Sequence, residues 1–164
     1  GTEPNINIGP LIDENAVKKV SEHVQDAIDN GAELLLGGHP HPLGGNYFTP
    51  TLISFATDAM KVAHEETFGP LAAVFPFDDE ETAIEMANDT QYGLASYFYS
   101  RDLARVWRVA EALEYGMVGI NTGLISNAAA PFGGVKASGL GREGGHQGLE
   151  EYLETKYLCI DLGK

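Results

Sequence analysis

The sequence predicts an α/β domain in which a parallel or mixed sheet is flanked by helices. Short apolar runs bounded by turn residues alternate along the chain with amphipathic segments of about ten or more residues. This alternation is typical of strands that are connected through helices. No internal repeat or low-complexity tract interrupts the pattern, and 164 residues are enough to build a hydrophobic core.

The first helix is expected over residues 14–30. Asp13-Glu14-Asn15 supply capping side chains and negative charge at its start, and Asn30-Gly31 is a typical end. Apolar side chains recur every three or four positions, at Val17, Val20, Val24 and Ile28. The spacing predicts a helix with one apolar face.

Strand-like runs follow this helix. Residues 33–36 are expected to form a short buried strand, and the prolines of 39–46 exclude regular structure there. Residues 47–53 resemble a strand in which Pro50 marks an edge or a break. The apolar run 71–77 predicts a strand buried on both faces.

The second half of the chain repeats this alternation. A helix is expected over 78–89 and another over 102–113, each beginning with an aspartate that can cap it. Residues 97–99 and 118–120 are expected to be strands. The alternating run 157–162 predicts a last strand.

The amino-acid composition limits the classes of partner that the chain could bind. Ten basic residues against 24 acidic ones give a net charge of −14, which argues against a nucleic acid or an anionic membrane as partner. No apolar run approaches the ~18 residues of a membrane span. A single cysteine suits a reducing compartment, so we expect a cytoplasmic protein. Because the chain starts at Gly1 without a methionine, we expect it to be a piece of a longer protein.

Several reactive side chains are interpreted as structural. His39 and His41 could hold a metal, but no cysteine or carboxylate at a suitable spacing completes a ligand set, so a surface loop and no metal site are expected. His64 could act as a base, yet no nucleophile is near it in the sequence. Cys159 lies in an apolar strand pattern and is expected to be a small buried hydrophobe.

The segment 131–143 is rich in glycine and also carries an aromatic residue and charges. This mixture favours a shaped loop over a flexible linker, since linkers lack ordered aromatic and charged residues. Gly139, Gly141 and Gly144, at the end of this segment and just beyond it, also have the G-x-G-x-x-G spacing of a dinucleotide-binding fingerprint. We reject that fingerprint because no buried strand precedes it and no apolar helix follows it.

Residues 65–70 join a polar stretch to the apolar run at Leu71. Glu66 could accept hydrogen bonds from the hydroxyls of a sugar, and Phe68 could cover a flat ring. Alternatively, Glu66 is a solvated carboxylate and Phe68 a core residue. From the residues alone, both interpretations stay open.

Three segments together resemble the aldehyde dehydrogenase superfamily in order and spacing: 66–70, 87–95 and 131–143. The resemblance covers essentially the whole chain and corresponds to the C-terminal third of that enzyme. Within the superfamily, residues 9–13 and 123–126 are most similar to the succinate-semialdehyde dehydrogenases.

The resemblance implies oxidation of succinic semialdehyde to succinate with NAD or NADP, through a cysteine thiohemiacetal and a thioester. It implies that Glu66 binds the nicotinamide ribose and that Phe68 contacts the nicotinamide. Ser126 would bind the distal carboxylate of the aldehyde substrate, and Phe132 would wall its pocket. Glu143 is a possible proton relay.

The family's nucleophilic cysteine, base glutamate, oxyanion-hole asparagine and nucleotide-binding domain correspond to sequence upstream of this chain. We therefore expect the isolated chain to be inactive and to bind NAD or NADP only weakly. Lys136 and Arg142 are expected to hold the glycine-rich loop in place. Asn88 and Asp89 are expected to cap the end of a helix.

By the same resemblance, residues 1–146 would be the C-terminal portion of the catalytic domain, and 147–164 a C-terminal helix with an oligomerisation strand. We expect a homo-oligomer in which 155–162 pairs across a subunit boundary. Two alternatives remain: another semialdehyde or aldehyde dehydrogenase of the same superfamily, or a non-catalytic, stand-alone interaction domain.

Overall fold

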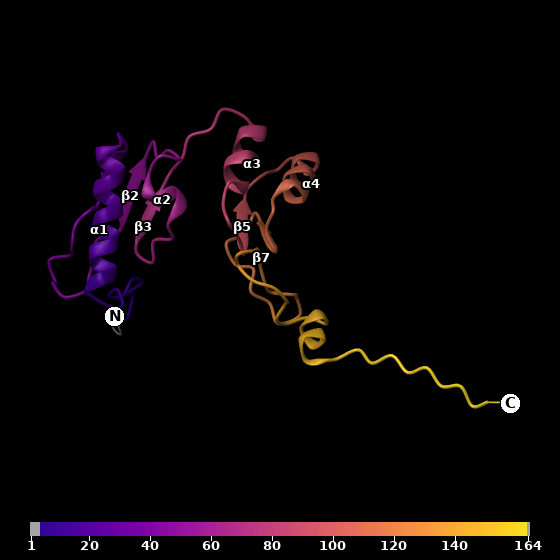
Figure 1. Cartoon of the computed structure of the whole chain (residues 1–164). Helices are drawn as coiled ribbons and strands as arrows, with labels where there is room; N and C mark the ends of the chain where they lie inside the picture. Colours follow the sequence, from indigo (N-terminus) through magenta and orange to yellow (C-terminus); the bar gives the residue numbers. More distant parts are fainter. Residues whose placement is uncertain (1–3, 164) are drawn as a thin grey trace. The chain divides into compact units, whose positions relative to one another are not determined.

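The computed structural model describes residues 4–163, which divide into two compact units, one ending at Phe77 and one beginning at Asp78 (Figure 1). The first unit contains α1 (Glu14–Asp29), β1 (Glu33–Leu36), β2 (Thr51–Ser54), α2 (Lys61–His64) and β3 (Leu71–Ala73). The second contains α3 (Glu80–Asn88), β4 (Tyr92–Gly93), β5 (Ala95–Phe98), α4 (Leu103–Ala112), β6 (Met117–Ile120), β7 (Val135–Lys136) and the 3-10 helix η1 (Gln147–Tyr152). The predicted α/β class is confirmed.

In the first unit, β2 is the central strand of a three-stranded sheet. It pairs antiparallel with β1 and parallel with β3, so the sheet is mixed. Helix α1 begins where predicted, because the Asp13 carboxylate accepts a hydrogen bond of 2.8 Å from the backbone N–H of Ala16. It ends before Gly31, whose φ of 96° is favourable for glycine.

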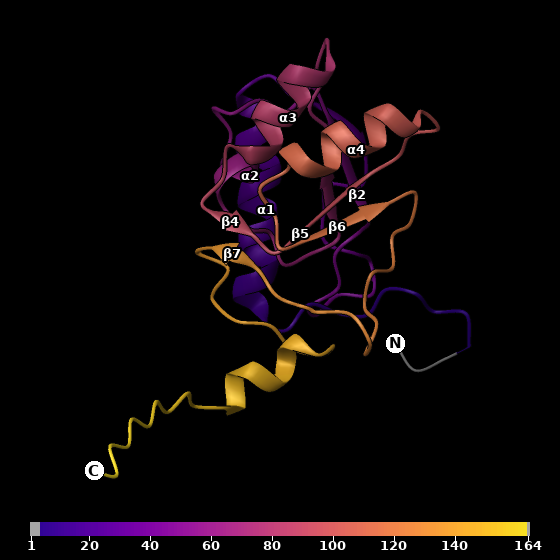
Figure 2. The same ribbon diagram turned by 90° about the vertical axis from the view of Figure 1, so that its right-hand side faces the viewer.

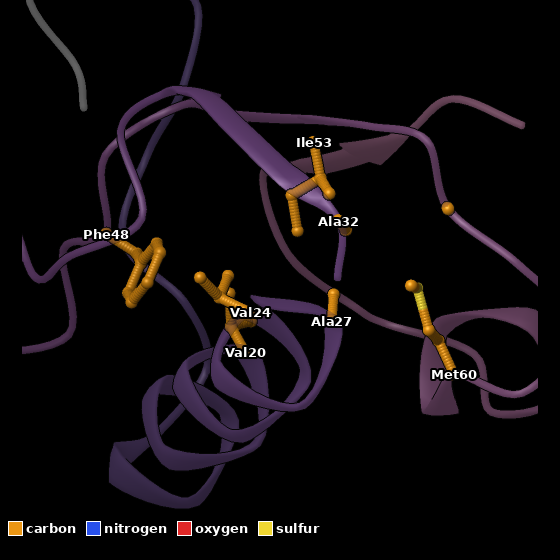
Figure 3. Close-up of a cluster of buried hydrophobic side chains, with 8 residues drawn as sticks. Val20, Val24, Ala27, Ala32, Phe48, Ile53 and Met60 are labelled. Carbon is orange, nitrogen blue, oxygen red and sulfur yellow. The ribbon is translucent and has the colours of Figure 1, made fainter. Parts of the chain in front are cut away.

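The hydrophobic core of this unit lies between α1 and the sheet. Figure 3 shows Val20, Val24 and Ala27 on α1, with Ile53 on the strand that faces them. The buried cluster consists of Val20, Val24, Ala27, Ala32, Phe48, Ile53, Ala56 and Met60. Ile53 is completely buried, as expected for a side chain on the central strand that points toward the helix.

All three predicted strands of this unit differ from expectation. The strand expected over 47–53 begins only at Thr51, as β2, and an isolated bridge at Phe48 precedes it. β1 occupies the predicted residues but is exposed rather than buried, because it is an edge strand that pairs only with β2. β3 is shorter than the predicted run 71–77 and is also an edge strand. Val74 and Phe77, beyond its end, are 49% and 61% exposed, so burial on both faces was a wrong prediction.

In the second unit, β5 and β6 form a parallel pair, and α4 packs against β6 (Figure 2). β4 and β7 form a separate antiparallel pair. Both predicted helices begin at an aspartate cap. Asp79 accepts from the N–H of Thr82 and Asp102 from that of Ala104, each at 2.8 Å. The strands predicted at 97–99 and 118–120 are confirmed within one or two residues.

Charged side chains connect α3 to α4. Glu80 accepts a hydrogen bond of 2.7 Å from Arg105 and one of 3.0 Å from Arg108. Hydrogen bonds from Arg108 and then Arg105 lower the pKa of the Glu80 carboxyl below its ordinary value. The two helices are therefore joined by a three-residue ionic cluster in addition to their packing.

The strand predicted at 157–162 does not form in the single chain. Residues 153–163 follow η1 without β-pairing to any described residue, and their side chains are exposed. A strand requires a partner edge, and no residue in the range 4–163 supplies one. Consequently Cys159 is exposed, not buried as predicted. The domain boundary predicted between 146 and 147 stays a prediction.

Among the described residues, no helix is long and apolar enough to cross a membrane.

Candidate functional site

The segment 65–70, between α2 and β3, carries two of the predicted site residues. Glu66 is exposed and Phe68 is 75% exposed, so Phe68 is not a core residue of this chain. No hydrogen bond or ion pair joins Glu66 to another residue that the structure describes. A free carboxylate and a bare aromatic ring therefore lie two positions apart on one short segment.

Backbone hydrogen bonds fix the end of this segment. The N–H of Gly69 donates to the carbonyl oxygen of Thr67 at 2.9 Å, and the N–H of Leu71 donates to that of Gly69 at 2.8 Å. The Pro70 carbonyl accepts from the N–H of Thr51 at 2.8 Å, which ties the segment to the start of β2. The side chains at 66 and 68 thus extend from an anchored backbone.

The glycine-rich segment of the second unit is closed at its base. The backbones of Phe132 and Glu143 exchange two hydrogen bonds of 2.7 Å. The guanidinium of Arg142 donates to the carbonyl oxygens of Gly134 at 2.8 Å and Gly141 at 2.7 Å. This confirms the prediction that Arg142 holds the loop in place.

Close approach explains the glycine at position 133. A Cβ there would lie 2.6 Å from the carbonyl oxygen of Gly141 and 2.8 Å from Cδ of Arg142. The glycines of the rejected fingerprint follow the two-residue strand β7 and precede a 3-10 helix. The structure therefore agrees that they are not a dinucleotide-binding turn.

Lys136 supports the loop from outside. Its Nζ donates to the carbonyl oxygens of Asn88 at 3.0 Å and Thr90 at 3.3 Å, and it forms an ion pair of 2.6 Å with Glu114. The structural role predicted for Lys136 is confirmed. Its backbone lies in the left-handed region, at φ 55°, where a side chain is strained.

The helix-end prediction for Asn88 and Asp89 is also confirmed. Asp89 is the C-cap of α3, and its backbone N–H donates to Glu85. The Asn88 side chain donates to the carbonyl oxygen of Ala112 at 2.8 Å and accepts from the N–H of Glu114 at 2.9 Å. It therefore binds the end of α3 to the end of α4.

A cavity of about 620 Å³ lies against the closed loop. Phe132 and Glu143 both line it, as expected for paired residues whose side chains share one face of the ladder. Arg142 and Leu149 also line it. Ser126 does not: it is an exposed residue of the preceding loop. The second unit therefore brings together two of its three predicted site residues.

The histidines predicted to be structural make local contacts. Nδ1 of His39 is 3.0 Å from the carbonyl oxygen of Pro40, and Nδ1 of His41 accepts from the N–H of Leu43 at 3.2 Å. The ring of His64 donates to the carbonyl oxygen of Asp58. Residues 4–163 contain no group of three or more histidines, cysteines and carboxylates arranged for a metal ion.

Sequence reasoning missed His23. This side chain lies on the apolar face of α1, is 1% exposed, and contacts Glu65 and Thr67 on either side of Glu66. The signal was present in the sequence. A histidine interrupts the apolar stripe of the 14–30 helix between Val20 and Val24, and a buried polar group needs a partner.

Comparison with known proteins identifies relatives over nearly the whole chain. Residues 1–158 match the model of the aldehyde dehydrogenase family. The chain is 62% identical to a glutarate-semialdehyde dehydrogenase of Pseudomonas aeruginosa over 160 residues, which are 98% of this chain and 33% of the relative. It is 60% identical to the NADP(+) succinate-semialdehyde dehydrogenase of Escherichia coli over 162 residues, 99% of this chain and 34% of the relative. It is 61% identical to a 3-sulfolactaldehyde dehydrogenase of Pseudomonas putida, again over 98% of this chain and 33% of the relative.

Solved structures give the same result. The succinate-semialdehyde dehydrogenase of Burkholderia pseudomallei superposes with a TM-score of 0.94 at 61% identity, covering 98% of this chain and 33% of that one. A Mycobacterium tuberculosis aldehyde dehydrogenase complexed with NAD+ superposes with a TM-score of 0.89 at 36% identity. The match covers 99% of this chain and 34% of that one. The chain thus spans about a third of the length of the relatives that it matches.

Proposed function

Because the chain belongs to the aldehyde dehydrogenase family, we propose that it is the C-terminal part of an NAD(P)-dependent enzyme that oxidises succinic semialdehyde to succinate. Exposed Glu66 and Phe68, on a segment with a fixed backbone, are the observation that carries the proposal. The proposed protein is cytoplasmic and homo-oligomeric, and its partner is a small aldehyde rather than a nucleic acid or a membrane.

The residues of the 65–70 segment fit the chemistry of a nicotinamide cofactor. A ribose presents hydroxyl donors, and the unpaired Glu66 carboxylate offers acceptors for them. A nicotinamide ring is flat, and the bare ring of Phe68 offers a surface to cover it. Glu66 would orient the ribose and Phe68 the ring, so that the cofactor is held in a reactive position. When bound, NAD(P)+ accepts the hydride that leaves the substrate carbon.

The second unit supplies groups for the aldehyde. Phe132 would form an apolar wall, and the Ser126 hydroxyl would donate a hydrogen bond to the distal carboxylate. Glu143, exposed on the cavity beside Phe132, would hold or pass a proton during hydrolysis of the acyl intermediate. The attacking cysteine thiolate would come from sequence upstream of this chain, so the isolated chain is proposed to be inactive and to bind NAD(P)+ weakly.

A second candidate substrate is glutaric semialdehyde, because a relative of that activity is 62% identical to this chain. It is one methylene longer than succinic semialdehyde. One extra methylene changes transition-state binding by only about 1–3 kcal/mol, so the two substrates must be compared directly.

The test is a steady-state assay of the full-length protein that contains this chain, followed by the absorbance of the reduced cofactor. Succinic semialdehyde, glutaric semialdehyde and 3-sulfolactaldehyde are each supplied with NAD+ and with NADP+. The highest kcat/KM is expected for succinic semialdehyde. A higher value for another aldehyde would reassign the substrate, and no turnover of any would favour a non-catalytic interaction domain. The isolated chain is assayed in parallel, and turnover by it would contradict the proposed inactivity.

A further inference from the structure

A buried histidine connects helix α1 to the segment that carries Glu66 and Phe68. Nδ1 of His23 lies 2.6 Å from Oγ1 of Thr67, and its Nε2 lies 3.3 Å from Oε2 of Glu65. The ring is 1% exposed, so water cannot replace these partners. Both of its hydrogen bonds go to one segment that is more than forty positions away in the sequence.

The chemistry of the partners assigns the protons. The ionised carboxylate of Glu65 can only accept, so Nε2 of His23 carries a hydrogen and donates it. The Thr67 hydroxyl can donate to Nδ1 or accept from it, so this contact does not depend on the tautomer of the ring. One imidazole thereby satisfies both of its nitrogens and holds two side chains of the segment.

The backbone of the segment separates these two side chains from the candidate cofactor ligands. Glu65 is extended, with φ −112° and ψ 126°, so its side chain and that of Glu66 point to opposite sides of the backbone. The side chains of 65 and 67 contact His23 on α1, although that of Glu65 is also 53% exposed. Glu66 has no hydrogen bond to a described residue, and Phe68 is 75% exposed. Holding the first pair therefore sets the direction of the second.

A second contact strengthens the arrangement. Gly69 lies so close to Val20 of α1 that a Cβ at Gly69 would overlap Cγ2 of the valine. Val20 and His23 are three residues apart and lie on one face of the helix. That face contacts the segment at positions 65, 67 and 69, on either side of Glu66 and Phe68.

We propose that His23 is a positioning residue for the nicotinamide cofactor. It acts through Glu65 and Thr67 to keep Glu66 and Phe68 in the orientation that receives the ribose and the ring. This role rests on the proposed function. A histidine that served only the core would lower stability when replaced, whereas a positioning residue also controls cofactor binding.

The experiment compares two substitutions on α1 in the full-length protein. His23→Leu fills the space without hydrogen bonds. Val24→Ala, the matched control, perturbs the neighbouring core residue, which is 3% exposed and has no hydrogen bond to the segment. His23→Leu should raise KM for the cofactor about fivefold or more, as the loss of one or two hydrogen bonds predicts. Val24→Ala should lower Tm but leave that KM within about twofold.

Conservative replacement supplies the internal check. The amide of His23→Gln can still donate to Glu65, so this variant should recover part of the cofactor affinity that His23→Leu loses. Thr67→Val deletes one hydroxyl and nothing else from the cluster. If His23→Leu does not fold, Thr67→Val carries the test, with an expected rise in cofactor KM of about threefold.

A readout that needs no activity separates this inference from the proposed function. Backbone hydrogen exchange at residues 66–69, without cofactor, should be faster in His23→Leu and Thr67→Val than in Val24→Ala. A wild-type protein without NAD(P)-dependent aldehyde oxidation would overturn the function, and the exchange rates would still decide the role of His23. Unchanged exchange and unchanged cofactor KM in both variants would overturn the positioning role.

Discussion

Phe132 and Glu143 face each other across a two-hydrogen-bond bridge that closes the glycine-rich loop. Their alignment is set by backbone groups, so it does not depend on a contact between the two side chains. The Arg142 guanidinium then binds two carbonyl oxygens within the same loop. An aromatic wall and a carboxylate are thereby presented together to one cavity.

Arg142→Lys should reduce kcat/KM for succinic semialdehyde about tenfold in the full-length protein. Both hydrogen bonds leave the single nitrogen Nη1 of Arg142, which lies one bond farther along the side chain than a lysine Nζ. The shorter lysine therefore loses at least one of the two charge-assisted hydrogen bonds. Steady-state kinetics measures the effect. Arg101→Lys, at an exposed arginine outside the loop, is the control and should leave kcat/KM unchanged. Equal rates for both variants would contradict a role for Arg142 in shaping the loop.

Ser126→Ala should raise KM for succinic semialdehyde about tenfold, because the distal carboxylate would lose a hydrogen bond to a charged group. The matched comparison is an uncharged aldehyde of the same chain length, whose KM should change less than about twofold. Parallel kinetic assays with the two aldehydes measure the difference. A similar rise for both substrates would show that Ser126 shapes the site without recognising the carboxylate.

Glu80 should make the second unit sensitive to acid. Its pKa is lowered in the folded state by Arg108 and Arg105, so its stabilising contribution is complete above the ordinary value of 4.5. That contribution is lost as the pH falls below 4.5 and through the lowered folded-state pKa. Thermal melting of the chain from pH 6 to pH 2 should therefore show a weaker dependence of Tm on pH for Glu80→Gln than for the wild type. The variant lacks one group whose pKa changes on folding. Glu81→Gln removes the same charge without breaking an ion pair between described residues, and an identical melting profile for both variants would refute the prediction.

Ile53→Ala should lower the free energy of unfolding by about 2–5 kcal/mol, because it leaves a cavity beside the α1 face of the core. Ile12→Ala makes the same chemical change at a side chain that is 90% exposed, and should change that free energy by less than about 0.5 kcal/mol. Urea unfolding followed by circular dichroism measures both. Comparable losses at the two positions would mean that the core lies elsewhere.

The terminal residues should decide the state of assembly. If 155–162 pairs with a second subunit, its alternate side chains face opposite sides, with Ile160 on one and Asp161 on the other. Ile160→Asn should shift the assembly toward the monomer by about tenfold in the dissociation constant, while Asp161→Asn should not. Light scattering over a range of concentrations measures the shift. A strictly monomeric wild-type protein at high concentration would rule out the predicted pairing.

The three longer α-helices, α1, α3 and α4, were predictable because their signals are local, whereas the four-residue α2 was not predicted. Asp13, Asp79 and Asp102 each cap a helix within a few residues of its first turn, and the structure places all three helices there. Strand burial depends on neighbours that are distant in the sequence. The apolar run in β1 gave no sign that β1 would be an exposed edge, because edge and centre differ only in pairing. The terminal run was mispredicted for the same reason.

The residues of the candidate site were likewise only partly predictable from the sequence. Glu66 and Phe68 were suggested by the residues and given roles by resemblance, and the structure adds their exposure. The link between Phe132 and Glu143 could not be predicted, since it requires the loop between them to close. His23 was missed because its partners lie on another element, and helical periodicity reports a side chain's face but not what that face will meet.

The same side of α1 supports both the interior of the first unit and the backing of its exposed segment. Fraying of α1 on gentle warming would therefore loosen both the hydrophobic core and the segment 65–70. Selection for catalysis and selection for stability would then act on neighbouring side chains of one helix face.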